Sequence, residues 1–172
     1  MGRVCSPRIH RVGRGLMARV CVDACFLIGL YDRNDQQHST AIRQFDALFG
    51  ENSPRHILVV PWPILYECCG TQQAKSSSKT SLFSTFWSYL EQRGQLIRLD
   101  DLQYREGPLK EQLRMPSRSL SLADRVIRSM ILDTRSLFDY FLTYNSGDFL
   151  DACKIRGIPL LNEKSEPGSY GL

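Results

Sequence analysis

Four acidic side chains stand at the ends of apolar runs, where a solvated carboxylate is uncommon. Asp23 and Glu67 each follow such a run, Asp124 lies at the start of a run with helical spacing, and Asp148 comes shortly after a fourth apolar stretch. Carboxylate oxygens are hard ligands that suit Mg²⁺ or Mn²⁺. A cation held among them would lower the pKa of a bound water and orient it for in-line attack. The four acids therefore predict a metal-dependent site, provided that the fold brings them together.

Short apolar strands alternate with amphipathic helices along the chain. The expected strands are 18–22, 57–60, 95–99, 137–143 and 158–161. The expected helices are 24–31, 39–49, a short one after Pro61, 81–92, part of 100–115, 121–135 and 149–156, with a surface loop at 72–79. This alternation predicts an α/β fold, a three-layer α/β/α sandwich with a mainly parallel four- to five-stranded sheet. The acids fall near strand carboxyl ends, where open α/β sheets build ligand sites.

Each acid also has an explanation that needs no site. Asp23 could act as the N-cap of a helix, and Asp148 could be a turn or cap residue. Asp124 stands three residues after Ser121, as in a capping box. Glu67 is the hardest to explain in this way, because it lies between an apolar stretch and two cysteines. A buried carboxylate needs a partner, and for Glu67 the alternative is a salt bridge to an arginine.

Length and charge predict one domain with polar ends. The chain has 172 residues and a net charge of +4, and four of its arginines lie in residues 1–16, which contain no acid. Without these four it carries 18 basic and 18 acidic residues, so global charge does not identify a ligand. We expect a disordered basic arm at 1–16 (or a spurious extension before a start at Met17), a domain at 17–162 and a polar tail at 163–172. No run approaches the ~20 apolar residues that span a bilayer.

Cysteine and histidine usage excludes several kinds of chemistry. The six cysteines form no CxxC pair and mostly lie in apolar runs, which predicts reduced thiols and a cytoplasmic protein. The three histidines, His10, His38 and His56, stand apart from the acids, which argues against histidine acid–base or nucleophilic mechanisms. No glycine-rich phosphate-binding motif is present. A phosphorylated receiver-like domain is a weaker alternative, because its acidic pair and strand-end lysine are not evident.

Four short motifs contain the acids, at 22–28, 60–67, 122–127 and 142–149. In composition and order they resemble the PIN-domain ribonucleases, and the resemblance covers about 18–161. It implies a sheet between helical layers and Mg²⁺- or Mn²⁺-dependent cleavage of RNA. Many bacterial members are toxins of the VapBC toxin–antitoxin type and act as dimers. The resemblance thus implies an RNA substrate, with an antitoxin protein and a homodimer as further partners.

Site residues follow from the resemblance by position. Asp23, Glu67, Asp124 and Asp148 correspond to the catalytic acids, and Asp23, Asp124 and Asp148 to the metal ligands. Thr143 and Asn145 would line the site. Asn145 is a neutral amide where many relatives have an acidic ligand, and Cys25 replaces a small polar residue.

These two departures leave a second hypothesis open, a catalytically weak PIN fold that binds RNA or protein. For RNA, Arg125 and Arg128 are expected to contact phosphates and Tyr144 to stack on a base. The alternative for both arginines is a solvated helix face or an ion pair.

Overall fold

A single parallel sheet forms the centre of the protein. The computed structural model describes residues 17–73, 76–115 and 120–165. Within them five strands pair in parallel in the order β3-β2-β1-β4-β5. Their bounds are Arg19–Val22 for β1, Ile57–Pro61 for β2, Leu96–Leu99 for β3, Tyr140–Leu142 for β4 and Leu160–Leu161 for β5.

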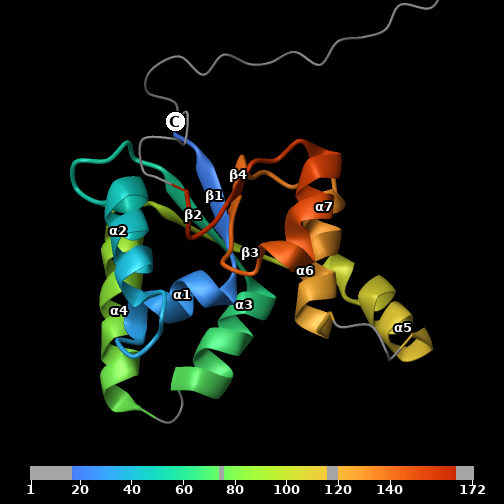
Figure 1. Cartoon of the computed structure of the whole chain (residues 1–172), viewed down its shortest axis with the longest axis horizontal. Coiled ribbons are helices and arrows are strands. Elements are labelled where there is room, and N and C mark those ends of the chain that lie inside the picture. The colour runs from blue at the N-terminus through green and yellow to red at the C-terminus, as the bar shows by residue number, and fades with distance from the viewer. Residues whose placement is uncertain (1–16, 74–75, 116–119, 166–172) are drawn as a thin grey trace, which may run out of the picture.

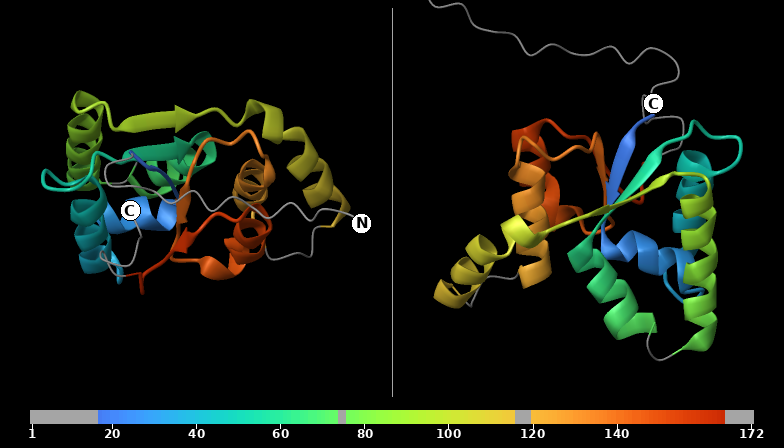
Figure 2. Two further views of the ribbon diagram at one scale, coloured as in Figure 1. Left: turned by 90° about the horizontal axis from the view of Figure 1, so that it is seen from above. Right: turned by 180° about the vertical axis from the view of Figure 1, so that it is seen from behind.

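Helices lie on both sides of this sheet. The α-helices are α1 Ala24–Tyr31, α2 His38–Phe49, α3 Trp62–Glu67, α4 Ser77–Gln92, α5 Glu106–Arg114, α6 Leu122–Leu132 and α7 Ser146–Arg156. A π-helical turn, η1, spans Cys68–Gln73, and a 3₁₀ turn, η2, spans Leu102–Tyr104. Figures 1 and 2 show α1, α2 and α4 on one side of the sheet and α6 and α7 on the other. The α/β/α sandwich predicted from the sequence is therefore confirmed, with five parallel strands.

The central strands are buried on both faces, which is why they are continuously apolar. Val20 and Val22 of β1 and Val60 of β2 are completely buried. Four completely buried phenylalanine rings from the helices and from β4 belong to the same core: Phe26, Phe49, Phe141 and Phe149. The edge strand β3 is different, because its two middle residues are exposed.

Several element boundaries differ from the sequence prediction. Helix α4 begins at Ser77, inside the expected loop, and η1 extends α3 beyond Glu67. Within the expected segment 100–115, helix α5 includes Gly107 and Pro108, which lie in its first turn, where a missing N–H has no intrahelical acceptor to lose. Helix α6 ends at Leu132 rather than near 135, since Asp133 adopts an extended backbone.

The chain changes direction across the sheet between β1 and β4. From β1 the strands proceed outward to β2 and β3, whereas β4 and β5 lie on the other side of β1. Such a switch point leaves a crevice at the strand carboxyl ends. The Asp23 N–H donates to the Leu142 carbonyl across this point, at 3.0 Å.

The structure follows the chain a little beyond the predicted domain end. Gln44 of α2 donates to the Asn162 carbonyl at 2.7 Å, which attaches the segment after β5 to the helical layer. The predicted arm at 1–16 and most of the predicted tail, from 166 onward, lie outside the described residues. Across the described helices, none combines the length and apolarity that crossing a bilayer requires.

Candidate acidic site at the carboxyl edge of the sheet

Asp23 is a buried carboxylate held by neutral donors. Its side chain is 6% exposed. Oδ1 accepts from the Ala24 N–H at 2.7 Å, so Asp23 does cap α1, as the simpler explanation predicts. Oδ2 accepts from the Thr143 hydroxyl at 2.8 Å and from the Cys25 thiol at 3.2 Å. The cap therefore uses one oxygen, while the other is bound by side chains from α1 and from the end of β4.

Burial raises the pKa of Asp23 above its ordinary value. The Thr143 hydroxyl, the Cys25 thiol and the Ala24 amide oppose this shift, and the charge of Asp124 adds to it. Burial and the neighbouring Asp23 raise the pKa of Cys25 to about 12. The thiol therefore stays protonated at neutral pH and can donate to the carboxylate. Its sulfur also accepts from the Tyr144 N–H at 3.1 Å, which ties α1 to the end of β4.

Glu67 brings a second element into the site. It is the last residue of α3 and is partly buried. Burial, followed by the charges of Asp23 and Asp124, raises its pKa from 4.5 to about 7. A carboxylate raises the pKa of another in this way only when the two lie close together. Asp23, Glu67 and Asp124, called the acidic site below, are therefore brought together from β1, α3 and α6.

Asp124 caps α6 and also lies close to Asp23 and Glu67. Its Oδ2 accepts from the Ser121 N–H at 3.1 Å and from the Ser121 hydroxyl at 2.7 Å. The Asp124 N–H donates back to the Ser121 hydroxyl at 3.1 Å, which completes the predicted capping box. The cap fixes the carboxylate at the start of α6, and its charge reaches both Asp23 and Glu67.

Asp148 is attached to this site through Asn145 and Thr143. The Asn145 side-chain amide donates to Asp148 Oδ2, and the Asn145 N–H donates to the Thr143 hydroxyl at 2.9 Å. That hydroxyl in turn donates to Asp23. The charges that raise the pKa of Glu67 come from Asp23 and Asp124. The structure thus joins Asp148 to the site by a hydrogen-bonded chain, one step away from the three coupled acids.

The donors present suit a hard cation, although they do not form a closed cage. In residues 17–73, 76–115 and 120–165, no group of three or more His, Cys, Asp or Glu side chains is arranged to hold a metal ion. Mg²⁺ keeps several waters and needs only one or two carboxylates from the protein. The mutual repulsion expressed in the pKa of Glu67 is what a divalent cation would relieve. The donor chemistry therefore fits Mg²⁺ or Mn²⁺ bound by few protein ligands.

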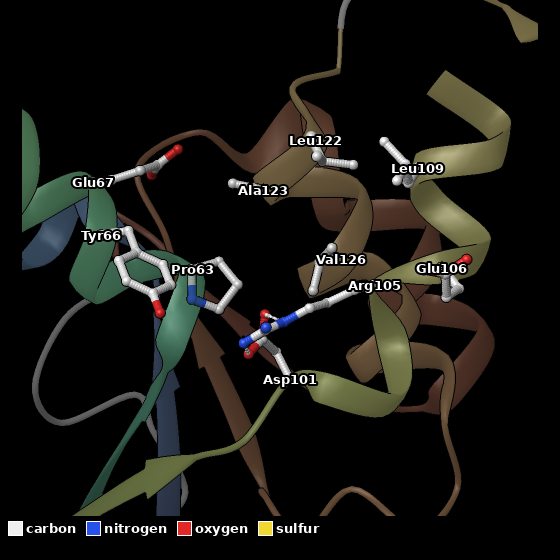
Figure 3. A pocket seen from close by; sticks show the side chains of 10 residues that line it. All are labelled: Pro63, Tyr66, Glu67, Asp101, Arg105, Glu106, Leu109, Leu122, Ala123 and Val126. Atoms are coloured by element: carbon white, nitrogen blue, oxygen red, sulfur yellow. Dashed lines mark hydrogen bonds and ion pairs between the residues drawn. The ribbon is translucent and has the colours of Figure 1, made fainter. Parts of the chain in front are cut away.

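A groove of about 580 Å³ opens beside the acids, between α3, α5 and α6. Its walls are largely apolar, with Pro63 and Tyr66 on α3 and Val126 on α6. Figure 3 shows Glu67 at one end of this α3–α6 groove, reaching towards the start of α6. At the other end Arg105 pairs with the buried Asp101, with an Nη2–Oδ1 distance of 2.7 Å. The groove therefore gives the acidic site an open approach.

The three residues expected to contact RNA are engaged elsewhere. Arg125 is 3% exposed, and its guanidinium bonds Glu111 at 2.9 Å and Gln112 at 2.7 Å, which fastens α6 to α5. Arg128 forms a bidentate pair with Asp151 of α7, both contacts at 2.6 Å. The phenol of Tyr144 donates to Gln44, and its ring packs edge-on against Phe26. In this arrangement both arginines follow the alternative reading, ion pairing.

Sequence reasoning missed two contributors to the site. It treated Cys25 only as a departure from the family pattern, yet its thiol is a direct hydrogen-bond donor to Asp23. The spacing Asp23-x-Cys25 after a strand was the available signal, because residues in the first turn of a helix face its N-cap. Tyr66, whose ring lines the groove next to Glu67, had no comparable signal.

Comparison with known proteins leaves the family unassigned. No protein-family model matches the chain, and no curated protein matches it.

Proposed function

We propose that this chain is an endoribonuclease that hydrolyses RNA phosphodiester bonds with Mg²⁺ or Mn²⁺. The supporting observation is the coupling of three acids from three elements, with the pKa of Glu67 raised to about 7. Structural ion pairs lower a carboxyl pKa, whereas burial among like charges raises it. Strongly raised carboxyl pKa values beside a groove are typical of catalytic sites.

Each acid has a distinct role in this proposal. Asp23 and Asp124 would hold the cation, and Asp148 would add a further oxygen ligand from the Asn145 corner. When bound, the cation supplies activation of a water and neutralises charge on the leaving oxygen. Glu67 exchanges a proton at its carboxyl, because a pKa of about 7 lets it take or give one near neutral pH. Thr143 and Cys25 hold the Asp23 carboxylate in one orientation.

The test is RNA cleavage by the full chain with Mg²⁺, with Mn²⁺ and with a chelator. Asp23→Asn and Asp124→Asn are compared with wild type, and Asp151→Asn is the matched control, since Asp151 pairs with Arg128 away from the acidic site. We expect metal-dependent cleavage that both site variants lose and the control keeps. Cleavage without metal, or equal activity in the site variants, would contradict the proposal.

A second candidate is a catalytically weak fold of the same kind that binds RNA or protein. It is favoured by the lack of a preformed three-ligand group in the described residues and by the neutral amide of Asn145 on Asp148. RNA binding that needs no metal, together with no cleavage in Mg²⁺ or Mn²⁺, would support it over the enzyme.

The same resemblance leads us to propose a cytoplasmic toxin restrained by an antitoxin, with a homodimer as its assembly. Five cysteines of the described chain are free thiols, which suits a reducing compartment. Induced expression should arrest growth, and Asp23→Asn should not. Normal growth at high expression of the active chain would contradict the toxin role and leave the ribonuclease in place.

A further inference from the structure

Both tryptophans of the chain line one cleft outside the acidic site. The cleft has a volume of about 460 Å³ and lies between α3, α4 and the edge strand β3. Trp62 and Tyr66 come from α3, Phe83 and Trp87 from α4, and Arg98 from β3. We call this the aromatic cleft. The chain has two tryptophans in all, so their emission reports on this surface alone.

The rings form two pairs with one helical turn between members. Trp62 and Tyr66 have centroids 5.8 Å apart, and Phe83 and Trp87 are stacked with centroids 5.4 Å apart. Trp62 is 38% and Tyr66 61% exposed, which is high for such large side chains. The Trp87 indole N–H donates to Glu91 at 2.9 Å and so fixes its ring. Exposed, fixed rings of this kind offer faces on which planar groups can stack.

Arg98 adds a cation to the same cleft. It is exposed on β3, and no acid of the described residues forms an ion pair with it. In the α3–α6 groove, by contrast, Arg105 is paired with Asp101. The charge of Arg98 is therefore available to an anionic ligand, and a phosphate beside stacked bases satisfies both features.

The aromatic cleft and the α3–α6 groove share one lining residue. Tyr66 lines both the aromatic cleft and the α3–α6 groove, and the next residue in the chain is Glu67. In Figure 3 the Tyr66 ring stands beside Pro63 at the groove wall below Glu67. A strand that passes from the α3–α6 groove over Tyr66 would bring its next nucleotides to the rings.

We propose that the aromatic cleft binds bases of single-stranded RNA next to the acidic site, an inference that rests on the proposed function. Stacking on the rings requires unpaired bases, because duplex bases bury their faces in each other. Arg98 holds a phosphate of the same strand. If the partner were a protein with an apolar surface, the charge of Arg98 would be buried without an anion. The charge therefore favours a nucleic acid as the partner.

Tryptophan emission with chelator present tests binding without cleavage. The full chain is titrated with a single-stranded RNA of about eight nucleotides and with the same sequence as a duplex. We expect the single strand to quench the emission and the duplex to have little effect. Trp62→Ala should weaken binding about tenfold, the loss of one stacked base. Ile155→Ala, a truncation of an exposed apolar residue on α7, should bind as wild type.

Arg98→Ser provides a second variant that does not alter the aromatic packing. It should weaken binding about threefold and reduce the slope of log affinity against log salt by about 0.7, as expected for one phosphate contact to a single strand. Arg98→Lys should restore most of the affinity. Circular dichroism and thermal unfolding of each variant verify the fold.

The outcomes separate this inference from the proposed function. Metal-dependent cleavage with unchanged tryptophan emission refutes the cleft and leaves the enzyme. Trp62-dependent quenching without cleavage refutes the enzyme and supports the cleft as a binding site. If RNA is not cleaved and the tryptophan emission does not change, both proposals are refuted. Self-association that Trp62→Ala abolishes, with no response to RNA, would identify a protein interface and overturn the inference.

Discussion

Carboxylates at two places in this protein have opposite surroundings. At the carboxyl edge of the sheet, burial raises the pKa of Asp23 and Glu67, and the hydrogen-bond donors of Asp23 are a thiol, a hydroxyl and an amide. Between α6 and α7, Arg128 lowers the pKa of Asp151 to about 2 through a bidentate pair. The two regions adjoin α6, which carries Asp124 of the first and Arg128 of the second.

The difference separates acids that stabilise the fold from acids that do not. Asp151 is stabilised as an anion by its partner, so folding favours its charge. Asp23 is disfavoured as an anion by burial and by Asp124, so folding opposes its charge. Groups held in an unfavourable state are expected where function needs them. We call the first region the acidic edge and the second, the Arg128–Asp151 pair, the α6–α7 seam. Four experiments test how the two differ.

The largest effect is expected from matched Asp→Asn substitutions in the two regions. Asp23→Asn should reduce RNA cleavage at least about 100-fold, the scale of losing one electrostatic group at a reaction centre. It should also raise the melting temperature, because an amide can accept from Ala24 and donate to Thr143 without a buried charge. Asp151→Asn should lower the melting temperature and keep cleavage. Cleavage assays and thermal unfolding measure both, and equal stability changes in the two variants would remove the distinction.

Metal should stabilise the acidic edge and leave the seam unaffected. A ligand bound only by the folded state adds about 2.7 kcal/mol at 100 times its Kd. For a domain of this size, that corresponds to a rise of roughly 5–10 °C in melting temperature. Wild type and Asp151→Asn should show the rise with Mg²⁺ or Mn²⁺, while Asp124→Asn should lose most of it. NaCl at matched ionic strength is the control, and a rise that persists in Asp124→Asn would place the metal elsewhere.

The two regions should give opposite pH dependences of stability. The folded-state pKa of Glu67 is about 7, above its ordinary 4.5, so the folded chain holds a proton that the unfolded chain releases between these values. Stability should therefore fall as pH rises through this window, by roughly 1 kcal/mol after solvent screening. Asp151, with a pKa of about 2 instead of 3.8, should contribute stability that is lost as pH falls below 3.8.

Urea unfolding across pH 3 to 8 measures both slopes. Glu67→Gln should flatten the upper window only, and Asp151→Asn the lower one only. If Glu67→Gln leaves the slope between pH 5 and 7 unchanged, the raised pKa belongs to another group.

Sequence pattern was enough for the framework and for part of the acidic site. Period and strand length predict the parallel sheet because buried strands must be continuously apolar, as Val20 and Val60 show. Their carboxyl ends then place Asp23 and Thr143 side by side, since β1 pairs with β4. Glu67 was noticeable for a physical reason, because the apolar stretch before it could not leave the following carboxylate fully solvated.

Features that depend on long-range packing were not accessible from the pattern. Arg125 reads as a surface residue until α5 docks and supplies Glu111 and Gln112. The hydrogen bond from Asn145 to the Asp148 carboxylate depends on how α7 leaves β4, which the pattern does not give. The start of α4 at Ser77 was hidden by a polar composition that is equally typical of a loop.

The smallest effect is expected from Asn145→Asp, which tests whether the Asn145–Asp148 corner can take part in binding the cation. Its side-chain amide donates a hydrogen bond to one oxygen of Asp148. Asn145→Asp replaces that donor with a carboxylate, so without metal the two acids repel and stability should drop by about 0.5 kcal/mol, as for like-charge neighbours on a helix.

With Mg²⁺ the same pair becomes an additional ligand set, and metal affinity should rise two- to fivefold, roughly 0.4–1 kcal/mol. Titration calorimetry with Mg²⁺ measures the affinity, and Asn145→Ala separates loss of the amide from gain of the charge. A variant that binds metal no better than Asn145→Ala would mean that the Asn145–Asp148 corner lies outside the cation's reach. In that case the functional edge is limited to the three acids that already share one field.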